Sequence, residues 1–214
     1  MTMKHLIKTS LLMLAFCLPL CAMAYDFEVG GVYYKTDLWG DFAMVCDQGE
    51  DGARYSGNVT IPATVTYDDT TYPVARINAY AFSNCAELTG VTMPNAVTEI
   101  GDHSFENCTS LSAVELPEAL TEIGAAAFEG CSAFTRIDIP AGVTKIGIWA
   151  FQNCINLTDV YSYIADPSQV DFGFNAFALE DEIYSSRTLH VPAGTIQAYK
   201  EAGWDTYFAN IVEM

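Results

Sequence analysis

The amino-acid sequence predicts a β-rich α+β solenoid, in which 23-residue units coil between an N-terminal β cap with a hairpin and a C-terminal helical cap. Three observations lead to this fold class. Phenylalanine and cysteine recur in one register through four units, apolar residues between them alternate with polar ones, and the pattern weakens at both ends. A period in this range is typical of solenoids, whose units bury against their neighbours a face that one unit cannot bury alone. The recurring positions are Phe82, Phe105, Phe128 and Phe151; Cys85, Cys108, Cys131 and Cys154; and Pro94, Pro117 and Pro140.

Residues 1–24 have the features of a secretory signal peptide. Lys4 and Lys8 precede an apolar run over residues 11–21, and Ala22-Met23-Ala24 supplies the small residues of a signal peptidase site. We expect cleavage between Ala24 and Tyr25. The sequence therefore predicts a protein that is secreted or displayed at the cell surface.

Two alternatives for this segment are a membrane anchor and a lipoprotein signal. The apolar run is shorter than the ~18–20 residues that a spanning helix needs, and we expect no transmembrane segment elsewhere in the chain. Lipidation would modify Cys21, but the bulky Leu20 stands where lipoprotein signals usually have a small residue. Export without lipidation is the preferred interpretation.

The chain after residue 24 is strongly acidic. All 27 Asp and Glu residues lie in residues 25–214, where seven Lys and Arg residues remain, so this part has a formal net charge of −20. Such a surface repels phosphate backbones and anionic headgroups, which excludes nucleic acid as a partner and argues against charge-driven docking on a membrane. An acidic surface attracts cationic partners or divalent ions, but solubility outside the cell is the simpler explanation and the preferred one.

Residues 25–72 are expected to form the N-terminal cap. Apolar residues predict strands over 27–34 and 42–46, and residues 59–62 start the first rung of the coil. The segment from Thr64 to Tyr72 then has two short polar–apolar runs around Asp68-Asp69, a pattern typical of a β-hairpin with a two-residue turn.

Residues 73–188 are expected to contain five repeats, each with two short extended segments and a turn. Residues 88–94 alternate apolar and polar side chains and end at a proline, which predicts a half-buried strand. Residues 97–101 predict a second extended segment, and residues 102–108 predict a tight turn or a single helical turn. One phenylalanine in each rung predicts aromatic rings stacked along the axis of the coil.

Residues 189–214 are expected to close the coil. Phe177 comes 26 residues after Phe151 and is not followed by the repeat's cysteine, so the repeat becomes irregular there. Residues 189–192 predict the last strand, and residues 195–202 predict a short helix. The apolar side chains expected to seal this end are Trp204, Tyr207, Phe208 and Ile211.

The unit from Cys108 to Cys131 has the form C-x-x-L-x-x-V-x-L-P-x-x-L-x-x-I-G-x-x-A-F-x-x-C. It resembles the BspA-like leucine-rich repeats of bacterial surface proteins. Residues 27–34, 55–62 and 191–212 are similar to the segments that flank the repeats in that family. The resemblance covers essentially the whole chain after residue 24. It implies a leucine-rich repeat fold and a role in adhesion or interaction, and it brings no catalytic motif with it.

Residue types that carry chemistry do not form a catalytic, cofactor-binding or metal-binding pattern, so we expect none of these sites. The five cysteines after residue 24 are spaced by the repeat, not as C-x-x-C pairs, and only His103 and His190 accompany them. Neither histidine has a nucleophile and an orienting group at the spacing of a catalytic triad. Asp68-Asp69 and Glu180-Asp181-Glu182 lack the pattern of a calcium loop, which favours solvated acids.

The repeat brings like cysteines onto adjacent rungs, where a disulfide is sterically conceivable. Their odd number and their common register favour small buried thiols instead.

Stacked strands align one exposed residue per rung into columns, and solenoids commonly bind partners on such a face. One column is Thr60, Thr92, Glu115, Asp138, Tyr161 and His190, and its neighbour is Asn58, Gly90, Ala113, Arg136, Asp159 and Thr188. Our candidate partner-binding residues are Thr92, Glu115, Arg136, Asp138, Tyr161 and His190. Side chains of these types are expected to gain no stability from lying one above another along the column. Glu115 and Asp138 are like charges on neighbouring strands and cost stability unless Arg136 or a partner offsets them.

These columns predict a non-catalytic protein that binds a protein or a glycan, in the host extracellular matrix or in the bacterial envelope. A basic protein segment, or a glycan stacked on Tyr161, is the expected ligand. The alternatives are a structural spacer and a carbohydrate-active hydrolase. A hydrolase needs two carboxylates that converge in a cleft, which a flat solenoid face does not provide.

Overall fold

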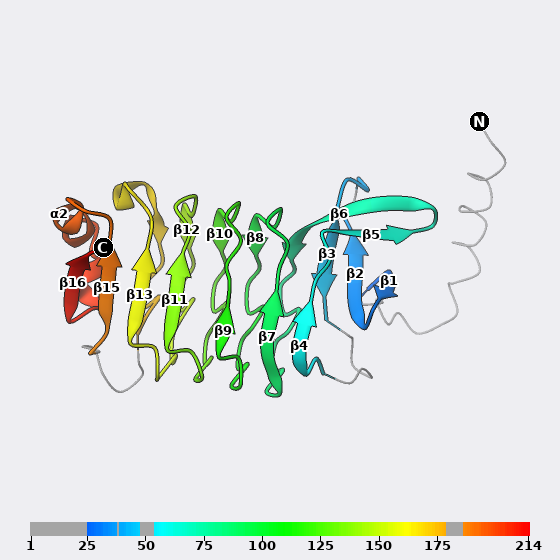
Figure 1. Ribbon diagram of the computed structural model, residues 1–214, viewed down its shortest axis with the longest axis horizontal. Helices are drawn as coiled ribbons and strands as arrows, with labels where there is room; N and C mark the ends of the chain where they lie inside the picture. The colour runs from blue at the N-terminus through cyan, green and yellow to red at the C-terminus, as the bar shows by residue number, and fades with distance from the viewer. Residues whose placement is uncertain (1–24, 38, 48–53, 179–185) are drawn as a thin grey trace.

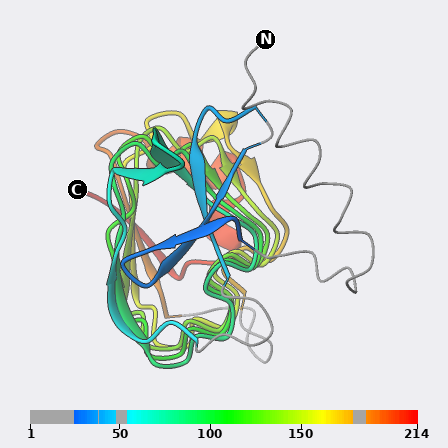
Figure 2. The same cartoon turned by 90° about the vertical axis from the view of Figure 1, so that its right-hand side faces the viewer.

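The computed structural model of the protein describes residues 25–37, 39–47, 54–178 and 186–214. These residues form an elongated right-to-left stack of rungs in Figure 1, and the view along the axis in Figure 2 shows that successive rungs superpose into one closed outline. The expected signal peptide over residues 1–24 and the acids Glu180-Asp181-Glu182 lie outside the described residues.

The N-terminal end is an antiparallel sheet that continues into the coil. Its strands are β1 (Phe27–Val29), β2 (Val32–Thr36) and β3 (Ala43–Cys46). The single strand expected over residues 27–34 is therefore wrong. Gly30 and Gly31 have φ values of 62° and 83°, a backbone that glycine adopts without strain, and they turn the chain between β1 and β2. β3 then runs parallel to β6 (Thr70–Ile77), which joins this sheet to the repeats.

The hairpin predicted between residues 64 and 72 is confirmed. β5 (Thr64–Tyr67) pairs antiparallel with β6, and Tyr67 lies opposite Thr70. Asp68 and Asp69 have φ values of 49° and 61°, as the tight turn between twisted strands requires. In Figure 1 the hairpin projects beyond the stack near its N-terminal end.

Each rung of the coil has three sides. The first, here called the strand face, contains β4 (Gly57–Thr60), β7 (Leu88–Thr92) and β9 (Ala113–Val114) in one parallel sheet. A separate parallel sheet continues the strand face with β11 (Arg136–Ile139), β13 (Asp159–Ser162), β15 (Thr188–Val191) and β16 (Asn210–Glu213). The strand face is thus interrupted between β9 and β11.

The second side is a continuous parallel sheet, here called the second sheet. After β6 it contains β8 (Glu99–Ile100), β10 (Glu122–Ile123), β12 (Lys145–Ile146) and β14 (Asp171–Phe172). Ile100, Ile123 and Ile146 lie side by side in register. The glycine after each isoleucine allows close stacking, because a Cβ on Gly101 would lie 2.6 Å from the backbone nitrogen of Ala79.

The third side, here called the turn side, consists of tight turns that carry the phenylalanine column. Backbone hydrogen bonds link successive turns, for example from Phe105 N to Ala127 O and from Phe128 N to Ala150 O, both 2.8 Å long. The predicted aromatic stack is confirmed. Phe128 lies between Phe105 and Phe151, with ring centroids 5.1 and 5.3 Å away, and all three rings are fully buried.

The C-terminal end covers the last aromatic rung. It contains η2 (Pro167–Gln169), α2 (Ile196–Glu201) and η3 (Trp204–Thr206). The predicted helix over residues 195–202 matches α2 within a residue at each end, and Trp204 is fully buried against Phe172, 4.3 Å between centroids. Phe208 is also buried, whereas Tyr207 is half-buried.

The strand at residues 188–191 is not the last one, contrary to the sequence-based expectation. β16 follows it and pairs in parallel with β15, with Leu189 opposite Ile211. The pairing extends the hydrogen-bond ladder by one strand beyond the repeats. Ile211 therefore closes the coil from within a strand, and β16 forms the outermost edge of the strand face.

Candidate binding face

The strand face brings the predicted columns into register on both sides of the interruption. Thr60 pairs with Thr92 across β4 and β7. Asp138 pairs with Tyr161, and Tyr161 with His190, across β11, β13 and β15. Apart from Ala113, whose burial is not described, the column positions are exposed or half-buried. Alternate residues of each strand point outward, while Val91, Ile137, Val160 and Leu189 point into the core.

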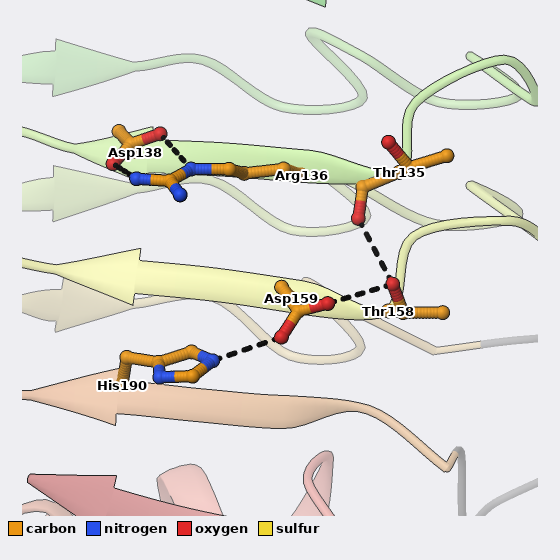
Figure 3. Close-up of polar contacts among 6 residues, drawn as sticks. All are labelled: Thr135, Arg136, Asp138, Thr158, Asp159 and His190. Atoms are coloured by element: carbon orange, nitrogen blue, oxygen red, sulfur yellow. Dashed lines mark hydrogen bonds and ion pairs between the residues drawn. The ribbon is translucent and has the colours of Figure 1, made fainter.

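Arg136 and Asp138 form a bidentate ion pair on the outer face of β11. Arg136 Nε donates to Asp138 Oδ2 and Arg136 Nη2 donates to Asp138 Oδ1, both over 2.7 Å (Figure 3). Tyr163 Oη donates to the same Oδ1 over 3.2 Å. The hydrogen bonds from Arg136 lower the pKa of Asp138 and raise that of Arg136, so both groups are charged at neutral pH.

Tyr161 lies between two cationic or titratable groups. The Arg136 guanidinium carbon is 3.7 Å from the centroid of the Tyr161 ring, and the His190 ring stacks on Tyr161 with a centroid distance of 4.0 Å and an interplanar angle of 1°. The expectation that these side chains gain nothing by stacking is therefore wrong. Cation–π attraction and ring stacking stabilise this arrangement, because strands in register hold the three groups about one rung apart.

Asp159 extends this group of side chains, although it was placed only in the second column. His190 Nε2 lies 2.9 Å from Asp159 Oδ1, and Thr158 Oγ1 donates to Asp159 Oδ2 over 2.8 Å (Figure 3). The hydrogen bond with His190 lowers the pKa of Asp159. We call Arg136, Asp138, Asp159, Tyr161, Tyr163 and His190 the C-terminal polar cluster.

Thr92 and Glu115 do not join the C-terminal polar cluster. Both are exposed and line a shallow hollow of about 420 Å³ over β4, β7 and β9. Glu115 and Asp138 also line a second, larger groove of about 620 Å³, where the strand face is interrupted. The structure thus divides the six predicted residues into two groups. Arg136 pairs with Asp138, which is one of the two ways that the sequence left open for offsetting the like charges of Glu115 and Asp138.

One feature that the sequence did not indicate lies behind the strand face. The side chain of Arg187 is fully buried and donates to three carbonyl oxygens, those of Leu157, Cys154 and Phe177. Burial lowers the pKa of Arg187. Arg187 stands outside the repeat pattern, and its partners are at least ten residues away in sequence, so no periodic signal points to it.

A second feature that sequence reasoning missed lies on the turn side. Three side chains there, His103, Glu106 and Glu129, could together hold a metal ion. Each offers one atom that could coordinate the ion, and these atoms lie within 4.8 Å of one another. His103 Nδ1 is 3.3 Å from Glu106 Oε2. The repeat could have indicated this cluster, because Glu106 and Glu129 occupy the same position of adjacent units and His103 precedes Glu106 by one turn.

The ladder cysteines are free and buried, as the sequence favoured. Cys108, Cys131 and Cys154 each direct Sγ at the carbonyl oxygen of the phenylalanine 26 residues earlier, over 3.1 to 3.2 Å. Burial raises the pKa of Cys108 and of Cys154 to about 12, and that of Cys131 strongly. These thiols act as core residues and hydrogen-bond donors.

Comparison with known families identifies the repeat. Residues 73–187 match the family model of the BspA type leucine rich repeat region, in six copies. The chain belongs to this family. Six copies are one more than the five repeats expected from the sequence columns. No curated protein sequence matches the chain.

Solved structures show the same fold. A leucine-rich repeat protein from Bacteroides capillosus is 36% identical, with a TM-score of 0.55, over 64% of this chain and 96% of that one. A leucine rich cell surface protein from Faecalibacterium prausnitzii is 25% identical, with a TM-score of 0.56, over 87% of this chain and 50% of that one. A leucine-rich repeat protein from Bacteroides ovatus is 20% identical, with a TM-score of 0.50, over 88% and 67% of the two chains.

The described residues contain no helix long and apolar enough to span a bilayer. The longest regular helix there, α2, has six residues.

Proposed function

We propose that this BspA-type leucine-rich repeat protein is exported and binds a protein or glycan partner, without catalysis, through its strand face. The observation that carries the proposal is the C-terminal polar cluster. It places a guanidinium, two carboxylates, an imidazole and two phenols on the outer side of three adjacent strands. Ordered polar and aromatic groups on a rigid sheet are the components of a binding surface.

The same geometry argues against the hydrolase alternative. A glycosidase needs one carboxyl group with a raised pKa that acts as general acid. Asp138 accepts hydrogen bonds from Arg136 and Tyr163, and its pKa is lowered. Glu115, the other predicted carboxylate of this pair, is exposed to solvent. The cell-surface name of the Faecalibacterium prausnitzii relative supports a place at the cell surface. The ordered ion pairs and stacked rings of the C-terminal polar cluster favour binding over a structural spacer or envelope component.

The experiment is a binding assay of the purified protein against immobilised host extracellular matrix and against envelope fractions of the producing bacterium. The variant Asp138→Ala with Tyr161→Ala dismantles the C-terminal polar cluster. We expect it to bind at least tenfold more weakly, about 1.4 kcal/mol, which is modest for one aromatic group and one charge.

The matched control is His103→Ala with Glu129→Ala on the turn side. If the control abolishes binding and the strand-face variant retains it, the partner binds the turn side and the proposal is wrong. Circular dichroism and melting temperatures of both variants establish that each remains folded at the assay temperature.

A further inference from the structure

The interruption of the strand face creates a groove with an apolar floor. β9 ends at Val114, and the sheets that contain β9 and β11 are separate. A groove of about 620 Å³ lies at this place. Its lining residues are Val114, Glu115, Leu116, Glu118, Asp138, Pro140, Ala141 and Tyr163. Four of the eight, Val114, Leu116, Pro140 and Ala141, are apolar, so water over this part of the groove has few hydrogen-bond partners and is readily displaced.

Two carboxylates of the groove have no cationic partner among the residues that the structure describes. Glu115 and Glu118 are exposed, and neither takes part in an ion pair with another residue that the structure describes. Asp138, the third acid of the groove, is already paired with Arg136 and hydrogen-bonded by Tyr163. The uncompensated negative charge of the groove therefore resides on the side of β9.

We propose that this groove binds the side chain of an arginine or lysine from an extended segment of a partner protein. This inference rests on the proposed function and names the ligand class of the strand face. The aliphatic stem of such a side chain would pack on Leu116, Pro140 and Ala141, and its cationic group would meet Glu115 and Glu118. The groove offers apolar groups beside two carboxylates. An arginine or lysine side chain, which has an aliphatic stem and a cationic end, is complementary to both.

Charge and aromatic placement favour a basic segment over a glycan. The net charge of −18 for the whole chain steers cationic partners toward the protein and repels acidic ones. A glycan would need an open aromatic ring on which to stack. Tyr161, the ring expected to serve this purpose, has Arg136 on one face and His190 on the other. The Tyr161 ring is therefore not open to the sugar that the sequence led us to expect there.

The test titrates the purified protein with the peptide acetyl-Leu-Arg-Leu-amide and follows the methyl resonances of Val114, Leu116 and Ala141 by NMR. The same peptide with citrulline in place of arginine keeps the shape and removes the charge. We expect the arginine peptide to shift these resonances and to bind at least tenfold more tightly than the citrulline peptide. Equal affinities, or shifts confined to other residues, would overturn the proposal.

The variant Glu115→Gln with Glu118→Gln removes the two carboxylates and nearly keeps their size. It should weaken binding of the arginine peptide at least tenfold. The matched control is Glu87→Gln with Asp205→Asn, which removes the same charge from exposed positions that do not line the groove. A control that weakens binding as much as the groove variant would mean nonspecific attraction to an acidic protein, and the inference would be wrong.

The binding assay distinguishes failure of the groove proposal from failure of the proposed function. In the matrix and envelope assay, loss of binding by the Asp138→Ala/Tyr161→Ala variant but not by the Glu115→Gln/Glu118→Gln variant would leave the strand face as binding surface and reject the groove. If both variants still bind, the strand face is not the binding surface, regardless of the result of the peptide titration. Binding lost in both is the expected result.

Discussion

The guanidinium of Arg187 donates a hydrogen bond to the carbonyl oxygen of Phe177. In the regular rungs a different group donates to the phenylalanine carbonyl oxygen. The cysteine of the following unit directs its thiol at the carbonyl oxygen of Phe82, Phe105 or Phe128. Phe177 begins the irregular end of the repeat. A charged side chain from a later segment thus takes over, for the last phenylalanine, a contact that a cysteine makes in the earlier units.

Arg187→Met should lower the free energy of unfolding by about 3–5 kcal/mol, because it leaves three buried carbonyl oxygens without this donor. Methionine keeps much of the volume, so the loss reports mainly on hydrogen bonding. Arg54→Met is the control, since Arg54 is exposed and, among the residues that the structure describes, its side chain donates one hydrogen bond, to Ser83 O. Urea titration measures both. Equal, small losses would show that the contacts of Arg187 contribute little.

Phe128→Ala should lower the free energy of unfolding by about 3–5 kcal/mol, the usual range for a buried phenylalanine. The ring is fully buried and stacks on both neighbours, so its removal leaves a cavity in the middle of the column. Phe174→Ala is the control, because the Phe174 side chain is 71% exposed. A denaturation midpoint of Phe128→Ala equal to that of wild type would contradict the stacked core.

The ladder thiols of the native protein should not react with a thiol reagent at pH 8, and all four should react after unfolding. Burial raises their pKa values, to about 12 for Cys108 and Cys154, so the reactive thiolate is absent. The same shifts stabilise the fold fully below the unfolded thiol pKa of about 8.5 and progressively less as pH rises toward 12. Mass spectrometry counts the labels. A bridge between Cys85 and Cys108, or between Cys131 and Cys154, would contradict free thiols.

Asp138→Asn should lower the free energy of unfolding by about 0.5–1 kcal/mol at pH 5–7, because the Asp138 side chain is 42% exposed and solvent weakens its ion pair with Arg136. The folded-state pKa of Asp138 is lowered. Its contribution is therefore present above the unfolded value near 3.9 and disappears as pH falls through the folded value. Urea titrations at pH 7 and pH 2.5 should show this difference shrink.

The core of this fold could be predicted from the sequence because the same core positions recur in every unit. Each of Phe105, Phe128 and Phe151 stands at the same position of its unit, and stacking copies that position along the axis. The register of Tyr161 with His190 follows from the same periodicity. Pairing of Arg136 with Asp138 was also accessible, because residues two apart on a strand share one face.

Features that break the repeat could not be predicted in this way. Val114 and Ile137 occupy equivalent positions, each two residues before an apolar residue and a proline, yet β9 ends at Val114 whereas β11 continues to Ile139. The groove lies where the sheets that contain these two strands separate. β16 lies beyond the repeats, and Arg187 has no counterpart at the same position of the earlier units, so a single sequence gives no second copy with which to compare either of them.

The interruption between β9 and β11 also has a mechanical consequence. Hydrogen-bonded backbone runs without a break along the second sheet and along the turn side at this level, but the strand face is divided there. Two walls of the coil therefore resist stretching more strongly than the third. We therefore expect bending to be easiest at the divided wall, and such a motion would change the width of the groove. Binding of a ligand in the proposed groove would then stiffen the rod at this rung.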